Sequence, residues 1–336
     1  MRPVPLSLLC CLAGTGPAIA TSILILTTGP AQAFDCARAT AEIDRAICGD
    51  DDARAANDRM ETAYFSLRDR LGAEARRTLL GGQKDWLAWR DANCGPVALC
   101  LAEASASRAG LLGQKSDGMV PFFNWQQGDT RHYDVVLQGF RFADAATGSA
   151  EAAYNTWLDA EIADTPFGKP VEDDIEMPTP FYHEVDVEVT RLDNRLLSAV
   201  AWSHDYSGGA HPNSWTTSVT IDRQTGAELD AKALFGEDGL AAIATECARQ
   251  IAAERSDSAE GEAVEAALHE LEETYPGTVA AHATDMHRWH FSPEGATIRF
   301  DSYAIGPYVA GPSECRFGED RIRALAGRPE LFAPSN

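Results

Sequence analysis

Apolar residues recur with two different periods along the chain, and the change of period divides it into two parts. In the first part, Tyr64 and Leu67 begin a series of apolar residues at helical spacing, as expected for the buried face of a helix. In the second part, Val185, Val187 and Val189 alternate with polar residues, which is the pattern of a half-buried strand. The pattern therefore predicts a helical N-terminal part followed by a part that is built on strands.

The second part contains several segments of each type. Strand-like patterns cover residues 132–142, 182–192, 196–202, 215–222, 296–300 and 304–308, and helical patterns cover residues 148–163 and 240–254. Strands that flank long helical stretches indicate an antiparallel or mixed sheet with helices packed on it. The predicted fold class is α+β, with a small helical domain before a sheet-plus-helices domain.

The chain begins with an apolar stretch that indicates export. Arg2 precedes an apolar run from residue 6 to 26, and Ala31-Gln32-Ala33 has the small-x-small pattern of a signal peptidase site. Residues 1–33 are therefore predicted to be a signal peptide cleaved before Phe34, which places the protein in the periplasm or outside the cell. An uncleaved membrane anchor is the alternative, because the run is long enough to span a bilayer. After cleavage we expect no contact with the membrane.

Cysteines remain in an even number once the signal peptide is removed. They are Cys36, Cys48, Cys94, Cys100, Cys247 and Cys315. In an exported protein this number predicts three disulfides. Two cysteines lie near the start of the helical region and two near its end, and a helical hairpin would bring those ends together. We therefore expect cross-pairing between the Cys36/Cys48 pair and the Cys94/Cys100 pair, with local pairing as the alternative.

Charge is distributed unevenly between the two parts. The chain has 51 acidic and 28 basic residues, a formal net charge of −23 and a pI near 4.6. Residues 34–115 contain 13 acids and 12 bases, so nearly all the negative charge lies beyond them. This shift predicts a helical domain at 34–113, a linker at 114–128 and a second domain at 129–336. So acidic a chain is unsuited to nucleic acid and attracts basic partners instead.

The helical domain contains three local features with structural predictions. Asp50 and the two aspartates after it can cap the helix that follows them. Gly81-Gly82 is expected to break or bend a helix. Trp86 and Trp89 are three residues apart, so they lie near one helix face, and we expect them to pack in the core.

Residues 34–113 carry a combination of motifs. The motifs are Phe34-Asp35-Cys36, residues 42–48 (EIDRAIC), Asn57-Asp58, Ala63-Tyr64, residues 83–87 (QKDWL), residues 90–95 (RDANCG) and Cys100-Leu101. Together they resemble the LprI-type domain, a family named after a bacterial lysozyme-inhibitor lipoprotein. The resemblance implies a link to lysozyme inhibition, and the sequence does not determine which of the two domains makes the contact. The lipid anchor of the namesake is not expected here, because Cys10 and Cys11 do not follow a small residue.

The second domain carries two further motifs. One spans residues 207–213 (SGGAHPN) and continues through Trp215 to residues 221–229 (IDRQTGAEL). The other spans residues 289–291 (WHF), 298–300 (IRF) and 303–312 (YAIGPYVAGP). Together they resemble the extracytoplasmic domain of RsiV, a lysozyme-sensing anti-sigma factor, and the domain beside the catalytic domain of PdaC-type peptidoglycan deacetylases. Neither sigma-factor control nor deacetylation is carried over, because the chain has no room for the regions that perform them.

The candidate binding residues lie in and beside these motifs. They are Tyr206, His211, Asn213, Tyr303 and Tyr308. His211 and Asn213 sit in a glycine-rich turn, where polar groups are exposed or bond the backbone. For Tyr303 and Tyr308 we favour core packing against the sheet, with an exposed aromatic contact as the alternative. A catalytic reading of Ser207 with His211 and Asp205 is not favoured, because the segment lacks a nucleophile elbow.

Two other features have a plain interpretation and a functional alternative. His282, Asp285, His287 and His290 form a sequence cluster that could bind a metal, but on a helix only some of them would share a face. We therefore predict neither a metal site nor a cofactor. The acidic runs at residues 172–174 and 260–273 are expected to be solvated surfaces whose negative field speeds the encounter with a cationic protein.

These observations support one main functional hypothesis. The protein is expected to be a non-enzymatic protein of the bacterial envelope that binds, and inhibits, lysozyme or a related basic muramidase by covering its substrate cleft. The alternative from another class is a cell-wall enzyme or an accessory domain that docks on peptidoglycan. A structural envelope protein with neither activity is a third hypothesis.

Overall fold

A computed structural model describes residues 34–114, 118–128, 133–169, 181–257 and 260–332. The predicted signal peptide at 1–33 and the acidic run at 172–174 lie outside these ranges. Within them, no helix is both long enough and apolar enough to cross a membrane.

The described residues form the following elements. The helices are α1 (Glu42–Gly49), α2 (Asp51–Arg70), α3 (Ala73–Cys94), α4 (Ala98–Leu112), α5 (Ala150–Asp164), α6 (Ala231–Ser256), α7 (Glu262–Thr274), α8 (Thr278–Thr284) and α9 (Glu319–Leu325). The strands are β1 (Met119–Gln127), β2 (Tyr133–Phe142), β3 (Phe181–Leu192), β4 (Leu196–Tyr206), β5 (Asn213–Asp222), β6 (Trp289–Ser292), β7 (Gly295–Phe300) and β8 (Ser313–Gly318). Short 3₁₀ helices are η1 (Cys36–Arg38), η2 (Met286–Arg288), η3 (Tyr308–Ala310) and η4 (Pro329–Phe332). The α+β fold class, with a helical part before a sheet-plus-helices part, is confirmed.

Helices α1 to α4 form an N-terminal helical unit. Asp50 caps α2 by accepting a hydrogen bond of 2.8 Å from the backbone N–H of Ala53, as its position predicts. Trp86 is buried, and Trp89 packs against Phe123 of strand β1 at 5.6 Å between ring centroids. The two tryptophans therefore join the helical unit to the sheet.

The prediction of a helix break at Gly81-Gly82 is wrong. Helix α3 continues through both glycines. A Cβ atom on Gly82 would lie 2.8 Å from the backbone nitrogen of Phe123, whereas one on Gly81 would meet nothing within 4 Å. Gly82 is therefore used for close packing of α3 on strand β1.

The cross-paired disulfides that we expected are also wrong. In the described residues Cys36 pairs with Cys48 and Cys94 pairs with Cys100, with Cα atoms 5.6 and 5.4 Å apart. The two ends of the helical region do meet, but through an apolar cluster centred on Ile47 and Leu101. Because side-chain packing joins the ends, each disulfide is left to close a local turn.

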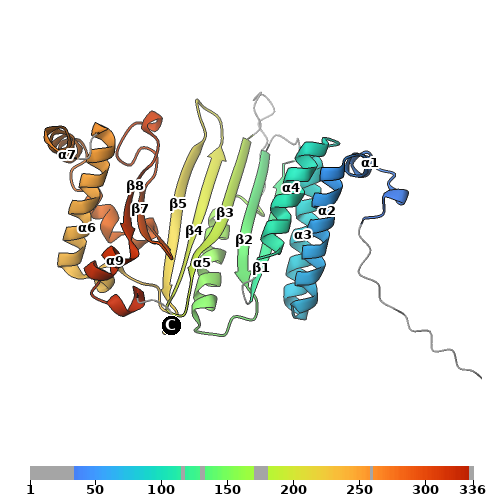
Figure 1. Ribbon diagram of the computed structural model, residues 1–336, viewed down its shortest axis with the longest axis horizontal. Helices are drawn as coiled ribbons and strands as arrows, with labels where there is room; N and C mark the ends of the chain where they lie inside the picture. Colours follow the sequence, from blue (N-terminus) through green and yellow to red (C-terminus); the bar gives the residue numbers. More distant parts are fainter. Residues whose placement is uncertain (1–33, 115–117, 129–132, 170–180, 258–259, 333–336) are drawn as a thin grey trace, which may run out of the picture.

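A five-stranded sheet forms the centre of the described structure, in the order β1-β2-β3-β4-β5 (Figure 1). Strands β2 and β3 are parallel, and the other neighbouring pairs are antiparallel. The connection between the parallel strands contains α5, which packs on one face of the sheet over Val187, Ala199 and Ile221. The segment 114–128, predicted as a linker, contains strand β1, which pairs with β2 along its whole length. The helical unit is thus joined directly to the sheet.

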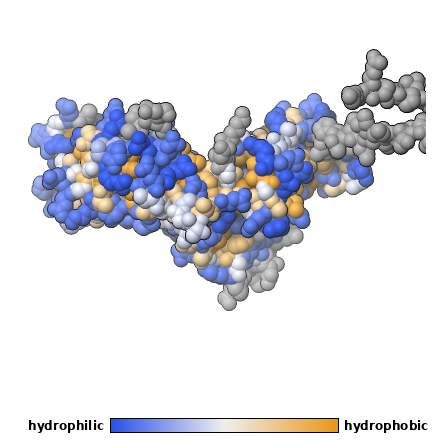
Figure 2. Space-filling model, turned by 90° about the horizontal axis from the view of Figure 1, so that it is seen from below, coloured by the Kyte–Doolittle hydropathy of each residue, from blue (hydrophilic) through white to orange (hydrophobic). Residues whose placement is uncertain are grey.

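Among the described residues, the opposite face of the sheet is covered at its two ends. At the β1–β2 end it packs on the helical unit through a cluster that includes Leu79, Phe123 and Val136. At the β4–β5 end it meets the second, three-stranded sheet β6-β7-β8, where the Phe291 N–H donates to Ser198 Oγ at 3.4 Å. Between the two covered ends the molecule is hollowed, and Figure 2 shows this hollow as a notch between two arms.

The second sheet and helices α6 to α9 form a C-terminal subdomain with its own core. Trp289 lies at the centre of this core and stacks on Phe235 and Phe291, and the Cys247–Cys315 disulfide joins α6 to β8. The strand predicted at 304–308 is absent, and the segment forms turns followed by η3. Gly306-Pro307 accounts for this difference, because proline has no backbone N–H to donate to a strand ladder.

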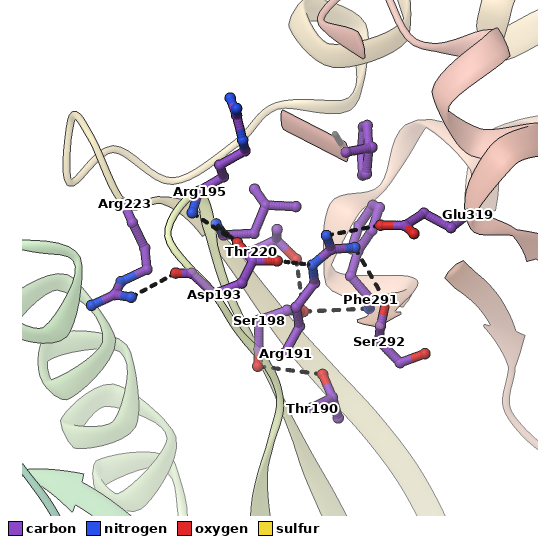
Figure 3. A network of polar contacts seen from close by, with 12 residues as sticks. Thr190, Arg191, Asp193, Arg195, Ser198, Thr220, Arg223, Phe291, Ser292 and Glu319 are labelled. Carbon is purple, nitrogen blue, oxygen red and sulfur yellow. Dashed lines mark hydrogen bonds and ion pairs between the residues drawn. The ribbon is translucent and has the colours of Figure 1, made fainter. Parts of the chain in front are cut away.

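A polar network holds the C-terminal subdomain against the central sheet (Figure 3). Arg191 of β3 is buried and donates to Asp193 Oδ2 at 2.6 Å, to the Ser292 carbonyl at 3.2 Å and to Glu319 Oε1 at 3.1 Å. Burial by itself would raise the pKa of Asp193, but two backbone N–H groups and Arg191 donate to this carboxylate and bring its pKa below the usual value. One buried side chain of β3 thus ties the central sheet to the C-terminal subdomain.

Candidate functional site

The two sequence motifs of the second domain meet in space at three aromatic side chains. His211, in the turn between β4 and β5, stacks on Tyr308 with ring centroids 3.5 Å apart and an interplanar angle of 9°. Its Nε2 atom lies 2.9 Å from the Tyr303 hydroxyl. The loop at 207–212 and the loop at 301–312 are thus locked together, although 92 residues separate His211 from Tyr303.

This aromatic cluster faces solvent. Tyr303 is 57% exposed and Val309, next to Tyr308, is 92% exposed. The favoured core packing is therefore wrong for Tyr303, which stands at a positive φ of 72° in the turns at 301–307. Tyr308 is half-buried and packs on His211. An exposed apolar group beside stacked rings is a surface that suits a partner.

Two further candidate residues lie next to the cluster. The Tyr206 hydroxyl donates to the Gly209 carbonyl at 3.1 Å, and its ring lies 6.3 Å from that of Tyr182. Asn213 is exposed and begins β5, opposite Asp205. The structure therefore brings all five predicted binding residues to the same end of the sheet, and their binding role stays a prediction.

The ring nitrogens of His211 both face groups other than Ser207 and Asp205. Its Nδ1 atom lies 2.9 Å from the Pro212 carbonyl and its Nε2 atom lies beside Tyr303. A base of a Ser-His-Asp arrangement needs one nitrogen on the nucleophile and the other on the carboxylate. In this geometry the histidine instead serves to hold two loops.

The histidines of the sequence cluster at 282–290 are separated. His282 stacks on Phe300 at 4.4 Å, His287 Nδ1 lies 3.0 Å from the Ser218 carbonyl, and His290 packs edge-on against Trp202. Asp285 caps η2 by accepting from the His287 N–H. The described residues contain no group of three or more acidic, histidine or cysteine side chains arranged to hold a metal ion.

Sequence reasoning missed a groove on the hollowed face. Glu184, Asp186 and Glu188 occupy every second position of β3 and are exposed, while Val185 and Val187 between them face α5. The groove has a volume of about 290 Å³. Its lining consists of Trp89, Phe123, Val136, Gln138, Glu184, Val185, Asp186, Trp202 and His204. The acidic half of the alternation was visible in the sequence, but the flanking aromatic walls come from three distant segments.

The carboxylates on the groove floor are poorly compensated. Although the Glu184 side chain reaches solvent, its partial desolvation in the groove raises its pKa, and the nearby Asp134 raises it further, while His204 acts in the opposite direction. Burial and then Glu188 raise the pKa of Asp186, which accepts one long hydrogen bond of 3.4 Å from Gln138. Within the described residues neither carboxylate forms an ion pair.

In the helical unit, the motif residues form a buried polar network. Arg90 is 4% exposed, donates to Asn57 Oδ1 at 3.2 Å and pairs with Asp91 at 2.7 Å. Arg108 is 1% exposed, and its Nε donates to Gln83 Oε1 at 3.1 Å while burial lowers its pKa to about 10. These side chains sit beneath a groove of about 670 Å³ that opens between α1, α2 and α3. Asn57, Gln83 and Arg90 of the sequence motifs therefore serve first to pack and hydrogen-bond the interior of the helical unit.

Comparison with known families gives one match in each of the two parts of the chain. Residues 36–112 match the family model described as "Lysozyme inhibitor LprI". The helical unit is an LprI-type domain. Residues 232–317, which follow the LprI-type domain in the sequence, match the model described as "Protein of unknown function (DUF3298)". The resemblance to RsiV and PdaC domains is compatible with this second match.

Solved structures of DUF3298 family proteins are similar to the chain that carries this LprI-type domain. A protein from Pseudomonas aeruginosa PAO1 is 15% identical with a TM-score of 0.45, and the match covers 66% of this chain and 99% of that one. A protein from Bacteroides fragilis NCTC 9343 is 15% identical with a TM-score of 0.44, covering 64% and 94%. No curated protein matches the chain.

Proposed function

We propose that the protein is an exported, non-catalytic protein of the bacterial envelope that binds a basic lysozyme or related muramidase and blocks its substrate cleft. The observation that carries this proposal is the LprI-type domain at 36–112, because the description of its family names a lysozyme inhibitor. The three disulfides of the described residues support folding in an oxidising compartment outside the cytoplasm.

The aromatic cluster supplies a surface suited to filling a cleft. Tyr303, Tyr308 and Val309 are held on a loop that His211 braces, so little conformational entropy is lost when the loop meets a partner. Tyr303 and Val309 are the exposed members of this group, and an exposed tyrosine on a rigid loop is a common anchor of protein interfaces. This loop can occupy a concave site without any bond being cleaved.

The charge of the chain supplies the attraction. A net charge of −23 draws a strongly basic protein toward the surface and raises the rate of association, an effect that falls as salt rises. The contact therefore combines a long-range electrostatic component with a local aromatic anchor.

The test is a titration of protein purified after export of the full chain against lysozymes of several types in a cell-wall lysis assay. We expect stoichiometric loss of lysis at low salt and weaker inhibition at moderate salt. Failure to bind any lysozyme type at low salt contradicts the proposal. Sedimentation with insoluble peptidoglycan, without lysozyme binding, favours the docking alternative.

Two matched variants locate the contact. Val309→Asp and Val97→Asp make the same change at exposed positions of the two units, and Val97 is the N-cap of α4, where aspartate is well tolerated. We expect V309D to weaken lysozyme binding at least tenfold and V97D to change it less than twofold. Loss of binding with V97D alone assigns the contact to the LprI-type domain and contradicts the role of the loop.

A further inference from the structure

The middle of this sheet face, which the described residues leave open, carries a distinct set of side chains. On this face β3 carries Glu184, Asp186 and Glu188 roughly 7 Å apart in succession, as alternate strand positions are. Neighbouring strands add Gln138 and His204, opposite Asp186 and Glu184. The three carboxylates therefore form a row of hydrogen-bond acceptors between the LprI-type domain and the C-terminal subdomain, and Gln138 donates to the middle one, Asp186.

Aromatic rings form the two walls of the groove above this row. Trp89 and Phe123 stand on the side of the LprI-type domain, and Trp202 stands on the other side. Trp202 already holds one guanidinium, since Arg299 lies 4.7 Å from its ring centroid. Indole faces beside carboxylates favour a cation, because the ring quadrupole and the negative charge act in the same direction.

We propose that this groove, named here the β3 groove and defined by Glu184, Asp186, Trp89 and Trp202, is a docking site for an arginine or lysine side chain of a basic protein partner. The proposal deepens the proposed function, on which it rests for the identity of the partner. The size of the groove, about 290 Å³, lies at the lower end of small-molecule sites and suits one long side chain.

Charge complementarity selects this occupant over a neutral glycan. A sugar would stack on the tryptophans but would leave the floor carboxylates without a counter-charge inside the groove. A guanidinium can contact the carboxylates and the tryptophans at the same time. Its N–H groups donate to a carboxylate in a bidentate fashion, and its plane stacks on indole. Occupation would thus relieve the repulsion that Glu188 and Glu184 exert on Asp186.

The experiment compares two variants that remove the same charge. Glu184→Gln with Asp186→Asn neutralises the groove floor, and Glu262→Gln with Glu270→Gln neutralises two exposed carboxylates of α7 that make none of the ion pairs found in the described residues. Both should fold, because neither pair of carboxylates holds a structural cation. Circular dichroism and thermal melting check this first.

Hexa-arginine and chitotetraose are the probes, with tryptophan fluorescence and calorimetry as readouts. We expect wild-type protein to bind hexa-arginine with a change in tryptophan emission, the groove variant to bind at least tenfold more weakly, and the α7 variant to stay within twofold. Equal weakening in both variants, or in neither, overturns the proposal. So does chitotetraose binding that is lost in the groove variant, because the site would then be a glycan site.

Lysozyme titration of the same variants separates this inference from the proposed function. If the groove variant inhibits lysozyme as well as wild type does, the β3 groove is not the docking site and the proposed function stands. If no lysozyme binds the wild-type protein but hexa-arginine binds in the groove, the proposed function is wrong and the β3 groove remains a docking site for a basic side chain.

Discussion

Arg191 in strand β3 and Glu319 in helix α9 form an ion pair of 3.1 Å across 128 residues of chain. The Arg191 side chain is 5% exposed and also contacts Asp193 and Ser292, so one side chain ties the central sheet to the C-terminal subdomain (Figure 3).

Replacing Arg191 with methionine should destabilise the protein by about 3–5 kcal/mol, because two carboxylates lose a buried partner. Chemical denaturation measures the change. Glu319→Gln should cost less, since Arg191 keeps Asp193 and the Ser292 carbonyl. An R191M protein within 1 kcal/mol of wild type would show that the network does not hold the subdomain.

Adjacent glycines of α3 should respond in opposite directions to alanine. Gly81→Ala should stabilise by about 0.5–1 kcal/mol, because it removes chain entropy from the unfolded state in open space. Gly82→Ala should destabilise by about 1–3 kcal/mol, because the new methyl group meets the backbone of Phe123 and forces α3 away from β1. Thermal melting of the two single variants checks both, and equal melting temperatures would refute the packing role of Gly82.

His290 should make stability depend on pH in the mildly acidic range. Burial, and then the charge of Arg299, lower its pKa to about 4 against 6.5 in the unfolded chain, and its Nε2 has no hydrogen-bond partner in the described residues. A lowered histidine pKa means that the unfolded state binds the proton first, so this contribution is complete above pH 6.5 and is lost as pH falls toward 4. The loss should reach about 3 kcal/mol.

The measurement is the free energy of unfolding from pH 7 to 4 for wild type and His290→Gln, whose curve should be flatter by that amount. His269, whose side chain is 79% exposed, is the control, and His269→Gln should keep the wild-type slope. Parallel curves for wild type and H290Q would exclude His290 as the source.

The disulfides should differ in their contribution to stability according to the loops that they close. The Cys247–Cys315 bond closes 68 residues and the Cys94–Cys100 bond closes 6, so the chain-entropy model predicts about 4 and about 2 kcal/mol. Double alanine variants of each pair, compared by chemical denaturation, measure the two contributions. A larger loss from C94A/C100A would contradict this order.

Neutralising the β3 groove should stabilise the protein while weakening its binding. The pKa values of Glu184 and Asp186 are raised, so the native state holds protons longer than the unfolded state does, and stability falls as pH rises through that interval. E184Q/D186N should therefore melt at a higher temperature than wild type at pH 7. A lower melting temperature would mean that these carboxylates stabilise the fold.

Local features of the chain could be read from its residues. The cap at Asp50, the alternating strand β3, the buried Trp86 and the even number of cysteines each depend on neighbours a few positions away. The same holds for the uneven distribution of charge. These features follow from backbone hydrogen bonding and from the periods of helix and strand, which short sequence windows already contain.

The tertiary structure decided everything that depends on distant segments. It paired Cys36 with Cys48, turned part of the expected linker into strand β1, and used Gly82 as a contact and not as a break. It also stacked His211 on Tyr308 and set aromatic walls on both sides of the acids of β3. Periodicity shows which face of an element is buried but not which element covers it, because that choice is made by packing among segments that are far apart in the chain.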